Sequence, residues 1–159
     1  MAFEEKIKLR TAITADIASI TQLYTETVLT VCTGEYNQNE LKTWASLGQN
    51  LERWKERIKN QYFLIAELGE KIVGFASLSH EGYLDVFYIH KDYQRRGIAF
   101  MLYNTLEEQA IRLSLKNIIA DVSKTAKPFF EKQGFLTLRE QQNHLKGYML
   151  INYKMEKKI

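Results

Sequence analysis

A short segment combines features suited to holding a phosphate group: Gln94, Arg95, Arg96, Gly97, Ile98 and Ala99. An apolar stretch precedes it and an amphipathic stretch follows it, so backbone N–H groups at a helix start would point in one direction. The helix dipole and the two arginines add positive potential. Because glycine has no side chain, an anion can approach the backbone closely. The segment predicts a pyrophosphate site, although the glycine would also suit a strand-to-helix turn that binds nothing.

Two other phosphate-binding loops do not fit this segment. A Walker loop has Lys-Ser or Lys-Thr after its last glycine, whereas Ile98 and Ala99 follow Gly97. A dinucleotide-binding fingerprint needs three glycines, and the segment contains one. A different class of phosphate-containing ligand is therefore expected.

Composition narrows the choice of partners. The chain has 159 residues, of which 45% are hydrophobic, and we expect residues 1–159 to form a single domain. Its 22 basic and 19 acidic residues are scattered and give a net charge of +3, which does not favour nucleic acid. No apolar run approaches the roughly 20 residues of a membrane helix, and the N-terminus lacks a signal-peptide core. We expect a cytoplasmic protein with no membrane partner.

Cysteine and histidine usage argues against metal chemistry. Cys32 is the only cysteine, so an internal disulfide and a multi-cysteine zinc site are both excluded. The three histidines, His80, His90 and His144, are too scattered for a ligand pattern. No metal is expected.

Hydrophobic periodicity predicts the elements that position these residues. A helix is expected to start near Thr14 or Asp16, either of which could cap it, and to continue to Val31. Further helices are expected at 37–49, 50–60, after Gly97 and at 127–133, and strands at 6–12, 62–68, 71–80, 82–89, 117–123, 135–142 and 147–155. Gly69-Glu70 is a turn signal between two of these strands. The order indicates a mixed α/β sheet with helices packed over it.

The chain resembles the GNAT superfamily of N-acetyltransferases. That family carries Gln/Arg-x-x-Gly-x-Gly/Ala after an apolar strand, and residues 94–99 match every defined position. A second family pattern follows in "DVSKTAKPFFEKQGF", which supplies its residues in order: Ser123, Ala126, Phe130, Gly134 and Phe135. The match is closest to a bacterial-type subgroup with a PFFE-x-x-GF motif.

The resemblance implies a fold and a cosubstrate. The fold would be a GNAT-like mixed, mostly antiparallel sheet, splayed at its centre, with helices on both faces. Acetyl-CoA would bind with its pyrophosphate on the N–H groups of residues 95–99. Its pantetheine arm would lie along the backbone of Phe87, Tyr88 and Ile89 like an added strand, near Ser123 and Phe130.

The resemblance also implies an activity, the direct transfer of acetyl to an amine in a ternary complex. Aminoglycosides, polyamines, amino acids and protein N-termini all remain open as acceptors, and so does a homodimer. A catalytically silent CoA-binding sensor or scaffold is the alternative. Four residues lie in the segment that would roof the acceptor pocket: Tyr24, Thr27, Tyr36 and Trp44.

Proton transfer needs a base and, in many relatives, an acid. Strand alternation predicts that Glu81, Tyr83, Asp85, Phe87 and Ile89 share one face. By resemblance the base stands near Tyr83, but a tyrosine cannot accept a proton at neutral pH, so Asp85 and Glu81 are the candidates. A backbone N–H near Tyr88 or Ile89 would stabilise the developing oxyanion.

The resemblance places a tyrosine acid where this chain has Phe130. Tyr88, Tyr148 and Tyr153 are possible replacements, and Tyr148 is our candidate for the proton donor.

Overall fold

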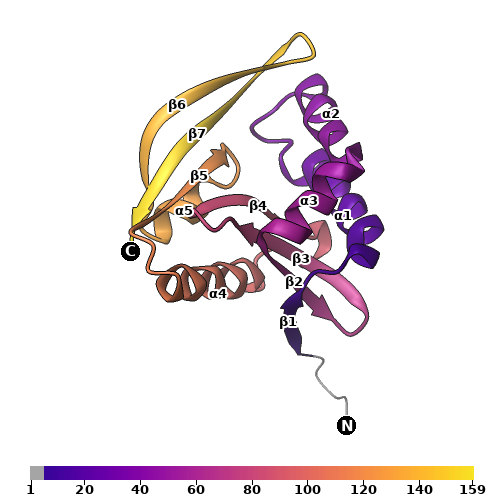
Figure 1. The fold of residues 1–159 in the computed structure, drawn as a ribbon. Coiled ribbons are helices and arrows are strands. Elements are labelled where there is room, and N and C mark those ends of the chain that lie inside the picture. The colour runs from indigo at the N-terminus through magenta and orange to yellow at the C-terminus, as the bar shows by residue number, and fades with distance from the viewer. Residues whose placement is uncertain (1–5) are drawn as a thin grey trace.

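The computed structural model describes residues 6–159 (Figure 1). Its main elements in chain order are β1 (Ile7–Thr11), α1 (Ile17–Val31), α2 (Gln38–Ser46), α3 (Leu51–Asn60), β2 (Tyr62–Leu68), β3 (Lys71–Leu78), β4 (Tyr83–Ile89), α4 (Ile98–Arg112), β5 (Asn117–Ser123), α5 (Lys127–Lys132), β6 (Leu136–Leu145) and β7 (Tyr148–Lys158). Within this part of the chain, seven strands form one sheet in the order β1-β2-β3-β4-β5-β7-β6. The mixed α/β fold expected from the sequence is confirmed.

The sheet opens at its centre, between β4 and β5. These two strands run parallel, whereas the other neighbouring strands of the described sheet run antiparallel. The β4–β5 pairing consists of Tyr83 with Ile119 and Leu84 with Ala120. Beyond those residues the two strands diverge, and β5 turns away with β6 and β7 (Figure 1). This is the predicted splay.

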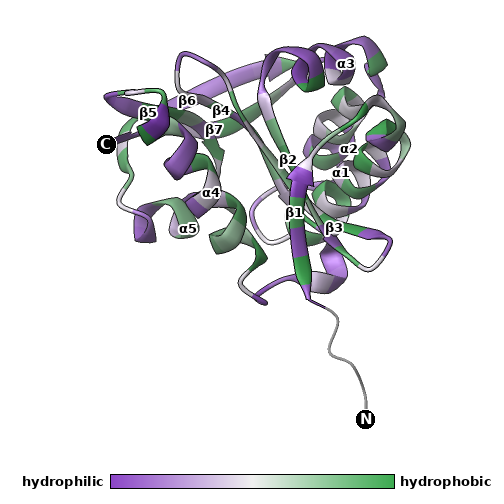
Figure 2. Ribbon diagram, turned by 60° about the horizontal axis from the view of Figure 1, so that its bottom comes forward, coloured by the Kyte–Doolittle hydropathy of each residue, from purple (hydrophilic) through white to green (hydrophobic). Residues whose placement is uncertain are grey.

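Helices cover both faces of the sheet. On one face, Leu102 and Leu106 of α4 are fully buried in a core that also contains Phe130 of α5. On the other, Ile20 of α1 and Trp54 of α3 pack over β2 and β3. The residues of α3 are mostly hydrophilic (Figure 2), so this helix lies at the surface. Its buried residue, Trp54, anchors it to the core. Burial of each large apolar side chain contributes about 1.5–3 kcal/mol to the free energy of folding.

A bulge in β4 reverses the alternation of side chains. Ala76 of β3 pairs with Phe87 and Leu78 pairs with Leu84, so Asp85 and Val86 together lie opposite a single β3 residue. Leu84 and Phe87 both join the core beneath α4, whereas Val86 joins the core beneath α1 and α3. The prediction that Asp85 shares a face with Phe87 and Ile89 is therefore wrong, since an inserted residue shifts the two-residue period.

The helix α1 begins where predicted, with Asp16 at its N-cap, but the Asp16 side chain does not cap it. A short 3-10 turn, Thr14–Asp16, precedes the helix. The Asp16 carboxylate accepts from the Ile13 N–H at 2.9 Å and pairs with the Arg10 guanidinium at 2.8 Å, rather than capping the first turn of α1. It thereby ties β1 to the beginning of the helix. The Arg10 hydrogen bond, aided by that of Ile13, holds the pKa of Asp16 below its usual value.

The β6–β7 hairpin forms the far side of the splay. Lys146 and Gly147 make its turn, both with positive φ. The hairpin reaches across the open end of the sheet to α2 (Figure 1), where the Lys146 Nζ donates to the Ser46 Oγ at 2.8 Å. The hairpin and the helical segment therefore enclose the space between β4 and β5. None of the helices described between residues 6 and 159 is long and apolar enough to cross a membrane.

Candidate active site

The segment that resembles a phosphate site forms a turn with exposed backbone at the start of α4. Arg95 and Gly97 both have positive φ, of 58° and 80°. Gly97 stands at the N-cap, and a Cβ atom added there would meet nothing within 4 Å. Where left-handed residues alternate with residues of other backbone conformation, successive N–H groups point to the same concave side and can bind an anion. The helix start adds its own unpaired N–H groups. The turn has the geometry that a pyrophosphate requires.

The other residues of this segment divide into supports and exposed cations. The Gln94 amide donates to the Ile89 carbonyl at 2.7 Å and to the His90 carbonyl at 3.3 Å, which fixes the loop to the end of β4. Ile98 is buried in the core, and Ala99 is half-buried beside it. Arg95 and Arg96 are exposed, and the Arg96 guanidinium lies 5.0 Å from the centre of the Tyr93 ring.

The backbone of β4 presents alternate amides to the splay. The His90 N–H donates to the Val73 carbonyl, and in an antiparallel ladder such bonded pairs alternate with unbonded ones. The register therefore turns the Tyr88 amides toward β3 and those of Phe87 and Ile89 toward β5. Thr27 and Gln94 already donate to the Ile89 carbonyl. The N–H groups of Phe87 and Ile89 are the ones positioned to meet an arm lying in the opening.

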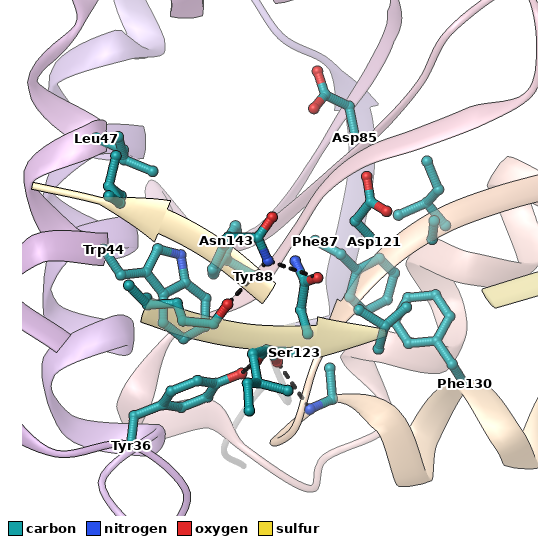
Figure 3. A pocket seen from close by; sticks show the side chains of 18 residues that line it. Tyr36, Trp44, Leu47, Asp85, Phe87, Tyr88, Asp121, Ser123, Phe130 and Asn143 are labelled. Atoms are coloured by element: carbon teal, nitrogen blue, oxygen red, sulfur yellow. Dashed lines mark hydrogen bonds between the residues drawn. The ribbon is translucent and has the colours of Figure 1, made fainter. Parts of the chain in front are cut away.

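A cavity of about 230 Å³ occupies the splay. It is lined by Tyr36, Trp44, Leu47, Leu84, Asp85, Phe87, Tyr88, Ala120, Asp121, Val122, Ser123, Ala126, Phe130, Asn143, Leu145, Leu150, Ile151 and Asn152. Figure 3 shows Tyr36 and Trp44 on one side of the cavity and Phe87 and Phe130 on the other. Residues far apart in the sequence thus meet in one pocket.

On the α5 side, the pocket wall is built from the second family pattern. The Ser123 Oγ accepts from the Ala126 N–H at 3.1 Å, which starts the turn into α5. The Phe130 ring lies edge-on to Phe87, with 5.5 Å between ring centres, and is almost wholly buried. Phe130 offers no hydroxyl to this wall, so its contribution is shape and hydrophobicity.

The four residues predicted to roof the acceptor pocket have two different roles. Tyr36 and Trp44 line the cavity. Tyr24 and Thr27 are buried behind it, where the Tyr24 hydroxyl donates to the Trp44 carbonyl at 2.9 Å and the Thr27 hydroxyl donates to the Ile89 carbonyl at 2.9 Å. These two residues hold the wall of the pocket rather than facing its interior.

The Tyr36 hydroxyl joins three parts of the chain. It donates to the Ile151 carbonyl of β7 at 2.6 Å and accepts from the Lys124 N–H at 3.0 Å, just after β5. Burial raises the pKa of Tyr36 to about 12, so the phenol stays protonated at neutral pH. The ring of Tyr36 also packs edge-on against Trp44 at 5.3 Å.

The predicted proton-transfer residues lie in different places. Asp85 lines the pocket, where its Oδ2 accepts from Arg57 Nε at 2.9 Å and Gln61 Nε2 at 2.8 Å. Glu81 is exposed in the loop before β4 and does not line the pocket. Tyr148 stands at the start of β7, beside the hairpin turn, with 40% of its surface exposed, and is also absent from the lining.

Sequence reasoning missed the wall supplied by the hairpin. Asp121 of β5 accepts from the Tyr83 hydroxyl at 2.6 Å and from Gln141 at 2.7 Å. Asn143 and Asn152 line the cavity beside it. One signal was present, because Asn152 is a lone polar residue in the apolar stretch "YMLINY". Burial and the nearby Asp121 raise the pKa of Tyr83, so its hydroxyl acts as a donor.

Known proteins share this architecture. A family model for the acetyltransferase (GNAT) domain matches residues 32–157. The chain is 29% identical to the uncharacterised N-acetyltransferase YafP of Escherichia coli K12 over 152 residues, 96% of each chain. The structure of a GCN5-related N-acetyltransferase from Rhodopseudomonas palustris, also described as a class-II aminotransferase, superposes with a TM-score of 0.92 at 26% identity and full coverage of both chains.

A more distant structure extends the comparison. PaiA N-acetyltransferase from Thermoplasma acidophilum, solved in complex with coenzyme A, has a TM-score of 0.80 at 18% identity and covers 97% of this chain and 99% of its own. At that identity the likeness concerns the fold. The family match covers most of the sequence, and the splayed sheet and glycine helix start are both in place: the chain belongs to the GNAT acetyltransferase family.

Proposed function

We propose that this protein transfers the acetyl group of acetyl-CoA directly to an amine acceptor. The observation that carries the proposal is the opening between β4 and β5, which holds a pocket and lies next to the anion-binding start of α4. Family membership supports the reaction class. When bound, acetyl-CoA would supply an acyl thioester that an amine can attack.

The residues present fit such a cosubstrate. The open space at Gly97 and the first-turn N–H groups of α4 suit a pyrophosphate, with Arg95 and Arg96 adding charge. The N–H groups of Phe87 and Ile89 suit a pantetheine arm that pairs like a strand. Ser123, Ala126 and Phe130 form the opposite wall.

Within the pocket, the chain must remove a proton from the amine. An alkylamine with a pKa near that of lysine, about 10.4, is mostly protonated at neutral pH. Asp85 is our choice of proton acceptor, directly or through one water, because it lines the pocket and only its Oδ2 bonds to Arg57 and Gln61. Whichever of the Phe87 and Ile89 N–H groups the arm leaves free is suited to polarising the thioester carbonyl, because both face the opening.

Loss of the thiol does not require the missing tyrosine. A thiol has a pKa of about 8.5, so it can leave as the thiolate near neutral pH. General acid catalysis contributes roughly 10²–10⁴-fold, so Phe130 is compatible with a slower but working enzyme. The same residue is the feature that favours the second candidate, a CoA-binding sensor without turnover.

Initial-rate kinetics test the proposal. Thiol release from acetyl-CoA is measured with a panel of primary amines while both concentrations are varied. Direct transfer predicts intersecting double-reciprocal lines and full activity in Cys32→Ala. Parallel lines would indicate an acyl-enzyme instead. Binding of CoA with no turnover on any amine would favour the sensor.

A further inference from the structure

A chain of hydrogen-bonded side chains runs along the hairpin wall of the pocket. The Asp121 Oδ1 accepts from the Gln141 Nε2 at 2.7 Å, and the same nitrogen donates to the Asn152 Oδ1 at 3.0 Å. The Asn143 Nδ2 donates to the Asn152 Oδ1 at 2.9 Å and to the Leu150 carbonyl at 3.0 Å. We call Asp121, Gln141, Asn152 and Asn143 the amide ladder.

The carboxylate of Asp121 fixes the direction of every bond in the ladder. An ionised carboxylate only accepts, so Gln141 must turn its amide nitrogen toward Asp121. The second hydrogen of that nitrogen then faces Asn152, which must present its oxygen. Asn143 meets two acceptors, the Asn152 oxygen and the Leu150 carbonyl, so it also presents its nitrogen. The Tyr83 hydroxyl of the neighbouring strand β4 donates to the other oxygen of Asp121 and fixes the orientation of the carboxylate.

This arrangement leaves one amide nitrogen and one amide oxygen, on neighbouring side chains, without a protein partner among the described residues. Among the bonds formed within residues 6–159, none involves the Asn152 Nδ2 or the Asn143 Oδ1. Both residues line the pocket, and Figure 3 shows the Asn143 amide between Trp44 and Asp121 in that view. The same lining holds apolar side chains, including Trp44, Leu47 and Leu145, together with the carboxylates of Asp85 and Asp121.

We infer that the acceptor carries a carboxamide or peptide group next to its amine, and that the amide ladder recognises it. An amide has one N–H face and one carbonyl, which match the Asn143 oxygen and the Asn152 nitrogen. Asn143 is exposed and Asn152 is half-buried, so a carboxylate would leave the Asn143 oxygen with water as its only donor, and an ammonium would leave the Asn152 nitrogen with water as its only acceptor. Lys154 stands opposite Asp121 in the β5–β7 register and forms no ion pair with it in the described chain. The inference rests on the proposed acetyl transfer.

A matched pair of amines tests this recognition. Leucinamide and 3-methylbutylamine share one carbon skeleton and differ by the carboxamide. The measured quantity is the ratio of their kcat/KM values, taken for the unmodified protein and for each variant. Comparing ratios cancels the different basicities of the two amines. Asn152→Asp replaces the free donor with an acceptor at nearly constant shape, and Asn143→Ala removes the free acceptor.

The ratio is expected to fall roughly five- to tenfold in Asn152→Asp and in Asn143→Ala, as loss of a single hydrogen bond implies. Asn104→Asp on the exposed side of α4 makes the same charge change away from the pocket and should keep the ratio. Circular dichroism checks folding of each variant. An unchanged ratio in both folded ladder variants would overturn the inference while leaving acetyl transfer intact. Absence of turnover with either amine in the unmodified protein would instead contradict the proposed function.

Discussion

Gly97 and Gly147 provide a controlled comparison at the scale of single residues. Both have left-handed φ, of 80° and 83°, and both leave open space where a Cβ atom would stand. Alanine at either position should cost roughly 1–2 kcal/mol of stability through backbone strain alone. Only Gly97→Ala should also reduce the thermal shift produced by acetyl-CoA, because its methyl group enters the proposed pyrophosphate site. Equal ligand-induced shifts in the two variants would contradict that site.

Tyr148 tests the source of the proton for the leaving thiol. The structure puts it beside the hairpin turn, away from the pocket lining. We therefore expect Tyr148→Phe to keep kcat within about twofold, since general acids usually contribute 10²-fold or more. Single-turnover rates at saturating acetyl-CoA and amine are the measurement. A loss of tenfold or greater would bring Tyr148 back as the acid.

Asp85 and Asp121 can be separated by their pH profiles. If Asp85 accepts the proton from the amine, Asp85→Asn should remove the acidic limb of kcat/KM. Asp121→Asn should keep that limb and lower the preference for leucinamide, because an amide at this position no longer sets the direction of the ladder. Retention of the limb in Asp85→Asn would move the base elsewhere.

At the scale of elements, one hydroxyl holds three segments around the pocket. Tyr36→Phe removes the bonds to the Ile151 carbonyl and the Lys124 N–H, and leaves two backbone groups unsatisfied. The expected cost is about 1–3 kcal/mol. Because the pocket wall loosens on the acceptor side, the amine KM should rise more than the acetyl-CoA KM. Equal increases in both would show that Tyr36 does not shape the acceptor side.

The junction between β1 and α1 should respond to acid. The Arg10 hydrogen bond keeps the pKa of Asp16 below its usual value, so the unfolded state takes up a proton at higher pH than the folded state. Stability should therefore be complete above about pH 5 and decline as the pH falls through the folded-state pKa. Asp16→Asn should flatten this decline in urea titrations between pH 5 and 3. A decline of unchanged slope would assign the acid sensitivity to other groups.

The order of elements was predictable from the sequence, whereas two details were not. Period-two and period-3.6 patterns located the helices and strands, and Gly69-Glu70 marked the β2–β3 turn where it occurs. The bulge at Asp85–Val86 leaves no local signal, because it depends on how β4 pairs with β3. The phosphate-binding segment was predictable because residues 94–99 are contiguous in the sequence. The hairpin wall was not, because it forms only when β7 pairs with β5.

For the whole molecule, the splay predicts a particular response to ligand. With acetyl-CoA at 100 times its Kd, linkage gives about 2.7 kcal/mol of added stability, or roughly 5–11 °C in Tm for a domain of this size. Hydrogen exchange should slow at the amides of Phe87 and Ile89, which face the opening. Exchange at Tyr88 should change less, since its N–H faces β3. Equal slowing at all three would point to general tightening rather than strand-like pairing.

The hairpin that crosses to α2 also places donor binding and acceptor recognition on different elements of the fold. The elements proposed to hold acetyl-CoA are spread from β4 to α5, whereas the amide ladder is supplied mainly by β6 and β7, the last two strands in the chain. The pocket end of the hairpin, from Asn143 to Asn152, can diverge while Met155 keeps its place in the core beneath α4 and Lys157 its ion pair with Glu107, because this end shares no hydrogen bond with the turn at Gly97 in the described chain. Acceptor preference could thus evolve, or be engineered by grafting one hairpin, while the acetyl donor stays the same.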